Sequence, residues 1–163
     1  MKAIQFKRFG PSSVLELVEM PLPKLSDNQD HMLINIKSSG INPIDAKIRE
    51  GSSFVCENLI LPSGLGFDLC GEIVAINSNV TDFKIGDVIL GKVENYDHPQ
   101  AYSEYCIVNQ HDIIMKPEAL NIEQAGAMPT AGLTAWQALH KHGKVKKGER
   151  VLIHAGAGGV GHL

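Results

Sequence analysis

The sequence lacks the features that mark several large protein classes. None of its apolar runs approaches the ~20 residues that cross a bilayer, and no lysine and arginine cluster marks a nucleic-acid surface. The 163 residues carry a net charge of −3. The first ten residues, MKAIQFKRFG, alternate polar and apolar side chains and have no apolar core of a signal peptide. We therefore expect a cytoplasmic protein with no nucleic-acid or membrane partner.

Cysteine is also scarce. The three cysteines, Cys56, Cys70 and Cys106, are far apart and form no C-x-x-C pair. An odd number of scattered thiols argues against a disulfide framework or a zinc knuckle. We interpret them as small buried apolar residues, with a reactive thiol as the alternative.

The first part of the chain has the pattern of an all-β domain. Residues 32–36 alternate apolar with more polar side chains, which is the period of a strand with one buried face. Further short strands, bounded by Gly, Pro, Asn or Asp, are predicted at 72–76, 87–90, 102–108 and 113–115. Several short strands at this spacing predict an all-β barrel or sandwich up to about residue 115.

The pattern changes from residue 121 onward. Apolar residues recur at helical spacing on both sides of Pro129, which should separate two helices. Gly143 stands where a glycine ends a helix. Residues 151–153 form a continuous apolar run, which is typical of a central parallel strand. Residues 121–163 are therefore predicted to open an α/β domain.

A glycine-rich loop follows this predicted strand directly and matches G-x-G-x-x-G. In a strand-to-helix context such glycines allow a tight turn, approach of the backbone to a pyrophosphate, and close helix packing. A glycine-rich connection without a ligand is the alternative. The candidate phosphate-binding residues are Gly156, Gly158, Gly159, Val160 and Gly161.

Leu163 ends the sequence before the crossover helix and before the residue that would read the ribose 2′ position. NADPH and NADH are therefore not distinguished. A parallel strand without neighbours would expose unpaired edges. We accordingly expect a truncated, proteolysed or cropped form of a longer enzyme.

Six motifs occur along the chain in this order: SSGINPIDAKIREG, LPSGLGFDLCGEIVAI, KIGDVILG, AYSEY, AGAMPTAGLTAWQAL and GERVLIHAGAGGVG. Together they resemble the medium-chain dehydrogenase/reductase family along essentially the whole chain. The resemblance implies a GroES-like catalytic β-barrel over residues 1–120. It further implies the linking helices, first strand and glycine loop of an incomplete Rossmann domain over 121–163.

Within this family the chain is most similar to the zinc-free, zeta-crystallin-like NADPH:quinone reductases. The catalytic zinc ligands of the alcohol dehydrogenases fall at Asn42, Phe67 and near Ala127, which do not form a zinc site. Three cysteines also cannot supply a four-cysteine structural zinc lobe. The resemblance therefore implies no metal, and hydride transfer from NADPH, or NADH, to small quinones or other conjugated carbonyls. An alkenal or enoyl reductase, or a non-catalytic truncated paralogue, is the alternative; the full-length protein is expected to be a homodimer.

Four side chains are candidates for this chemistry. The resemblance places Asn42 beside the nicotinamide and substrate and Thr130 at the nicotinamide end of the cofactor. Asn42 and Asp45 also fit a helix start, with Asn42 as N-cap and Asp45 in the first turn, and Thr130 also fits a simple cap. Lys47 stands where several quinone reductases carry a tyrosine proposed to bind substrate. We assign Asn42, Asp45 and Lys47 to the catalytic side, with a solvated surface lysine as the alternative at Lys47.

Overall fold

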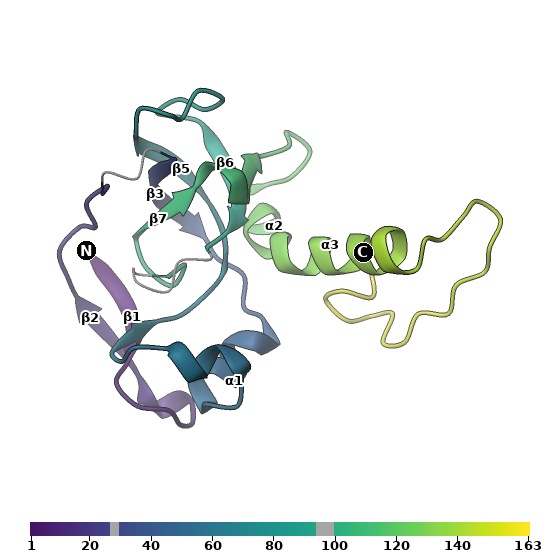
Figure 1. Ribbon diagram of the computed structural model, residues 1–163, viewed down its shortest axis with the longest axis horizontal. Helices are drawn as coiled ribbons and strands as arrows, with labels where there is room; N and C mark the ends of the chain where they lie inside the picture. The colour runs from purple at the N-terminus through teal and green to yellow at the C-terminus, as the bar shows by residue number, and fades with distance from the viewer. Residues whose placement is uncertain (27–29, 94–99) are drawn as a thin grey trace.

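Two antiparallel sheets form the centre of the protein in the computed structural model, which describes residues 1–26, 30–93 and 100–163 (Figure 1). The three-stranded sheet has the order β2-β1-β4 and the five-stranded sheet the order β7-β3-β5-β6-β8. The strands are β1 Lys2–Phe6, β2 Leu15–Glu19, β3 His31–Ser38, β4 Ser63–Gly64, β5 Asp68–Ile76, β6 Val88–Lys92, β7 Tyr105–Asn109 and β8 Ile113–Met115. This confirms the predicted β-rich first part.

The segment that leads into β7 joins the two sheets. Ala3 of β1 forms a bridge with Ser103, and the Ile4 N–H donates to the Tyr102 carbonyl at 2.8 Å. The prediction of one strand over 102–108 is therefore correct only from Tyr105 onward. Before that residue the chain runs alongside β1, and the Tyr102 N–H donates to the Leu65 carbonyl. The strands predicted at 32–36, 72–76 and 113–115 lie within β3, β5 and β8, and the one predicted at 87–90 overlaps β6, which begins one residue later at Val88.

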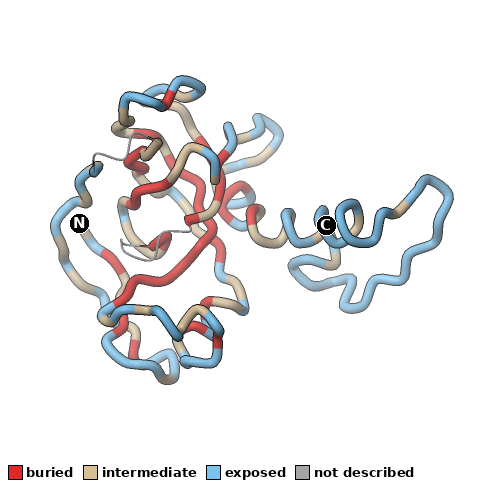
Figure 2. Tube along the Cα trace, in the orientation of Figure 1, coloured by how far each residue is buried: buried red, intermediate tan, exposed pale blue. Residues whose placement is uncertain are grey.

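Alternating side chains of the larger sheet fill the main core. Met32 and Ile34 of β3 and Ile73 of β5 are completely buried, as the period-two pattern requires. A second core forms around Phe6 and Ile48, between β1 and the helix α1, Pro43–Glu50. Both cores appear as the buried segments of Figure 2, which are concentrated in the sheets.

The remaining helices are short. Three single 3-10 turns are η1 Ser12–Val14, η2 Phe54–Asn58 and η3 Gln110–Asp112. After the barrel come α2 Ile122–Ala127, α3 Pro129–Trp136 and the π-helix η4 Gln137–His142.

Pro129 separates α2 from α3, as predicted. The predicted glycine at the end of the last helix is present, because Gly143 follows η4 directly. Gly143 keeps a right-handed conformation, however, and the left-handed residue is Lys144 with φ of 51°.

Helix α2 packs closely against the loop that follows β3. A Cβ at Gly126 would lie 2.2 Å from the Ser38 hydroxyl, and a Cβ at Gly40 would lie 2.9 Å from the Gly126 carbonyl. The Ser38 hydroxyl donates to the Ile122 carbonyl at 2.6 Å. This packing fixes where α3 begins relative to the barrel.

The predicted strand at 151–153 is not formed, which corrects the sequence interpretation. Val151, Leu152 and Ile153 are 48%, 82% and 51% exposed, and the segment after η4 loops away from the barrel (Figure 1). A parallel strand is held by hydrogen bonds to neighbouring strands. No described residue pairs with this run, so its backbone stays without a ladder. Within the described residues, no helix combines the length and apolar character needed to cross a membrane.

Candidate active site

A buried carboxylate connects three segments that are far apart in the sequence. Asp68, the first residue of β5, has no exposed surface. Its Oδ2 accepts a hydrogen bond from Asn42 Nδ2 at 2.9 Å. Its Oδ1 accepts two from Thr130, one from the backbone N–H at 3.0 Å and one from the hydroxyl at 2.5 Å. Two residues predicted from the sequence, Asn42 and Thr130, are therefore brought together by a third that was not predicted.

The start of α3 explains why a carboxylate lies there. The first N–H groups of a helix have no partner within the helix, and its N-terminus favours negative charge. Pro129 occupies the first position and has no N–H, and Met128 before it supplies no capping side chain. Asp68 satisfies the next N–H, that of Thr130. The barrel thus caps α3 with a side chain from β5.

The start of α1 uses a second buried acid. Asp45 is 3% exposed, and its Oδ2 accepts hydrogen bonds from the Asn42 N–H at 2.7 Å and from the Tyr102 hydroxyl at 2.9 Å. Its Oδ1 is buried and has no hydrogen-bond partner among the described residues. Asn42 at the N-cap, Pro43 at the first helical position and Asp45 in the first turn confirm the predicted helix start. Asp45 is more deeply buried than Asn42 and binds its backbone N–H. A contact between Asp45 and the substrate stays a prediction.

Burial dominates the electrostatics of both acids. It raises the pKa of Asp68 above the ordinary aspartate value, while hydrogen bonds from Thr130 and Asn42 and the charge of Lys92 oppose the rise. Burial likewise raises the pKa of Asp45, and the negative charge of Asp68 adds to the rise. Burial also raises the pKa of Tyr102, together with the adjacent Asp45, so the phenol stays protonated and donates.

A glycine makes room for this Tyr102. Gly66 has φ of +93°, and a Cβ on it would lie 2.4 Å from the Tyr102 ring. Both the conformation and the contact require glycine. The next residue, Phe67, is buried in the second core among Phe6, Ile48 and their neighbours. An apolar core side chain therefore occupies the position where the zinc alcohol dehydrogenases place a histidine.

Beside Thr130 a groove of about 520 Å³ opens between α3 and the β6–β8 edge of the sheet. Thr130, Leu133 and Gln137 form one wall, and Lys92 and Ile113 belong to the other. Asn42 and Thr130 are half-buried, whereas Asp68 behind them is fully buried. Two neutral polar side chains therefore lie near the surface, and both are hydrogen-bonded to the buried Asp68 carboxylate.

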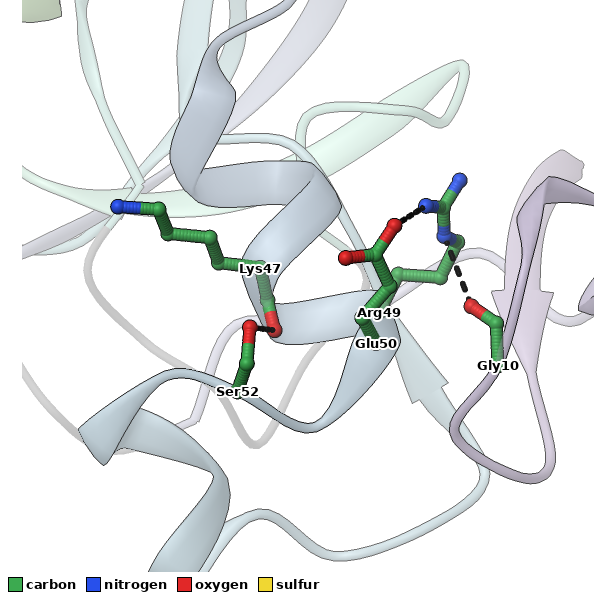
Figure 3. A network of polar contacts seen from close by, with 5 residues as sticks. All are labelled: Gly10, Lys47, Arg49, Glu50 and Ser52. Atoms are coloured by element: carbon green, nitrogen blue, oxygen red, sulfur yellow. Dashed lines mark hydrogen bonds and ion pairs between the residues drawn. The ribbon is translucent and has the colours of Figure 1, made fainter.

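Lys47 does not contact the cluster of Asn42, Asp68 and Thr130. It lies exposed on α1, and its backbone carbonyl accepts from the Ser52 hydroxyl at 3.2 Å. Figure 3 shows its side chain extending away from Arg49, which donates to the Gly10 carbonyl at 3.1 Å. Its ammonium joins none of the hydrogen bonds and ion pairs found among the described residues.

The glycine loop lies outside the cluster in an exposed run of turns. Gly156, Gly158, Gly159 and Val160 are exposed, and Gly161 is half-buried. The Gly158 N–H donates to the Ala155 carbonyl at 2.8 Å, within the loop itself. Among the described residues the loop adjoins no helix.

Sequence reasoning missed Asp68 and the role of Tyr102. One signal was present: an aspartate stands directly before the apolar start of a buried strand, in GFDLCG. Buried aspartates are rare unless they are paired. Among the described residues, no three His, Cys, Asp or Glu side chains gather as a metal site would require.

The family follows from comparison with known proteins. Residues 28–118 match the model of the alcohol dehydrogenase GroES-like domain. The chain belongs to this family. The match confirms the predicted GroES-like barrel of the medium-chain dehydrogenases and reductases.

Two solved structures superpose well on the chain. The quinone oxidoreductase from Coxiella burnetii has a TM-score of 0.91 and 50% identity, over 100% of this chain and 51% of that one. The Escherichia coli quinone oxidoreductase complexed with NADPH has a TM-score of 0.85 and 33% identity, over 99% and 47%.

Among curated relatives, a 2-methylene-furan-3-one reductase of Solanum lycopersicum is 34% identical, over 100% of this chain and 42% of its own length. The chain spans about half the length of the curated relatives it matches.

Proposed function

We propose that the protein containing this chain is a reductase that transfers a hydride from NADPH, with NADH as the alternative, to a small quinone or another conjugated carbonyl. One observation carries the proposal: Asn42 and Thr130, predicted separately from the family motifs, meet on one buried carboxylate. Of the two, Thr130 lines the groove beside α3. The similarity to quinone oxidoreductases, one of them complexed with NADPH, supports the same reaction.

The chain's residues fit the cofactor at one end. NADPH, when bound, supplies the hydride. Asn42 and Thr130 are polar, partly exposed and held in place, as residues at a nicotinamide must be. The Gly156–Gly161 loop is our proposed pyrophosphate site, but its present run of turns does not form the cradle. A parallel sheet around residues 151–153 is what that cradle requires.

The substrate class follows from the proposed absence of zinc. Phe67 is a core residue, and the Asn42 amide is bound to Asp68, which leaves neither free to ligate a metal. Without a Lewis acid, a substrate must accept hydride readily. Quinones and conjugated ketones do so because the added charge delocalises. Lys47 stays the proposed donor to the resulting oxyanion, and Asp45 supports Asn42 from behind.

Two alternatives have their own support. An enone or enoyl reductase is favoured by the similarity to the Solanum lycopersicum 2-methylene-furan-3-one reductase. A non-catalytic truncated paralogue, retaining only the barrel, is favoured by the unformed glycine loop. We further propose that residues 1–120 are the catalytic domain, that residues 121–163 open the dinucleotide-binding domain, and that the full-length protein is a cytoplasmic homodimer.

The test is turnover on matched acceptors. The full-length protein is incubated with NADPH or NADH and with benzoquinone, methyl vinyl ketone or acetaldehyde, with and without a chelator. We expect oxidation of NADPH with benzoquinone, little with acetaldehyde, and no effect of the chelator. Faster reduction of the enone favours the alternative reductase. No oxidation and no NADPH binding would leave the non-catalytic paralogue.

A further inference from the structure

We infer that Asp68 is a positioning residue, which sets the orientation of the Asn42 amide and the placement of Thr130 for the proposed reaction. The inference rests on the proposed function and goes beyond it, because no role was assigned to Asp68 from the sequence, although it lies within a family motif. It starts from the chemistry of the acceptor. An ionised carboxylate carries no hydrogen and only accepts hydrogen bonds.

Asn42 must therefore turn its NH2 end toward Asp68. The observed contact is Asn42 Nδ2 to Asp68 Oδ2 at 2.9 Å. The carbonyl oxygen of the same amide is turned away from the carboxylate. Asn42 is the N-cap of α1, where its side chain also faces the Asp45 N–H in a capping box. The buried charge and this capping contact favour the same orientation of the amide.

The same carboxylate holds the other candidate. Asp68 Oδ1 accepts from both the N–H and the hydroxyl of Thr130, at 3.0 and 2.5 Å. The hydroxyl hydrogen of Thr130 is thus directed inward. One buried group therefore fixes two polar side chains, one at the N-cap of α1 and one in the first turn of α3. Oδ2 of Asp68 binds Asn42, and Oδ1 binds Thr130.

Replacement by asparagine changes this polarity without changing the size. A side-chain amide has one acceptor oxygen and one donor NH2. If its oxygen stays with the two Thr130 donors, its NH2 faces Asn42 and meets another NH2 group. Asn42 must then reverse its amide or move away. Asp68→Asn thus changes the orientation of the Asn42 amide while it leaves the size of the side chain in β5 unchanged.

The test is a double-mutant cycle in the full-length protein, with NADPH oxidation by benzoquinone as the assay. The variants are Asp68→Asn, Asn42→Ala and the two combined, and Asp87→Asn, in the turn before β6, is the control. We expect Asp68→Asn to raise the KM for NADPH about tenfold, the effect of one lost hydrogen bond to a charged group. The double variant should be no worse than Asn42→Ala alone, because Asp68 acts through Asn42. The control should match the wild type.

A merely structural role predicts a different result. If Asp68→Asn only destabilised the fold, the amount of active enzyme would fall, and the KM for NADPH of the enzyme that remains folded would equal that of the wild type. Unchanged KM in Asp68→Asn, or effects that multiply in the double variant, would overturn the inference. Should Asp68→Asn fail to fold, Asp68→Glu keeps the charge but displaces it by one methylene. We expect a raised KM there too, and a wild-type KM would refute the role. A wild type that does not oxidise NADPH would instead refute the proposed function, and this inference with it.

Discussion

Thr130→Val tests the contact on which the candidate site depends. The substitution keeps the shape and the β-branch, and threonine and valine have similar helix propensities. It removes only the hydroxyl that donates to Asp68 Oδ1 at 2.5 Å and leaves the backbone donor in place. Hydrogen bonds to charged groups contribute about 1.5–3 kcal/mol. Because Asp68 is fully buried, water cannot replace the lost donor. We expect a loss of about 2 kcal/mol in the free energy of unfolding at neutral pH.

Thr134→Val is the matched control, one turn further along α3. The Thr134 hydroxyl donates to the Thr130 carbonyl within the helix and is exposed, so its loss should cost at most about 0.5 kcal/mol. Urea unfolding of the three proteins, followed by circular dichroism, gives the free energies by linear extrapolation. Equal costs for the two variants would show that the hydroxyl bond to Asp68 contributes nothing, and our explanation of how α3 is held would be wrong.

Two further predictions concern the residues around this contact. Gly66→Ala should cost at least about 2 kcal/mol more than Gly86→Ala by urea unfolding. Both glycines have φ of +93°, but only at Gly66 does the new methyl meet the Tyr102 ring; similar costs would contradict the close packing. The second prediction concerns pH. Burial raises the folded-state pKa of Asp45 and Asp68, so the stability linked to these groups is complete below their unfolded pKa and is lost as pH rises through the folded pKa. The stability of Asp68→Asn relative to wild type should therefore improve from acid to neutral pH, and a fall over that range would refute the raised pKa.

Local patterns predicted the barrel well. The alternation at 32–36 places Met32 and Ile34 in the core, and Pro129 divides the helices where its missing N–H requires. The strand predicted at 151–153 failed for a physical reason. A central parallel strand depends on neighbours, and its apolar sequence alone cannot supply them.

The site was less accessible to sequence reasoning. Asn42 and Thr130 were predicted from motifs, but their meeting point depends on tertiary packing. Asp68 joins them only because Gly40 and Gly126 let α2 approach the barrel and bring the start of α3 over β5. Periodicity describes which face of a strand is buried. It does not reveal which buried side chain two distant segments share.

The most direct test of the central claim is to map where NADPH binds. Isotope-labelled full-length protein is titrated with NADPH, and the backbone and side-chain amide signals are followed by NMR. We expect the signals of the Asn42 side-chain amide and the Thr130 backbone amide to shift together with those of the Gly156–Gly161 loop, with saturation at one common affinity. Shifts confined to other parts of the barrel, or no shifts at all, would contradict a cofactor site built on Asp68.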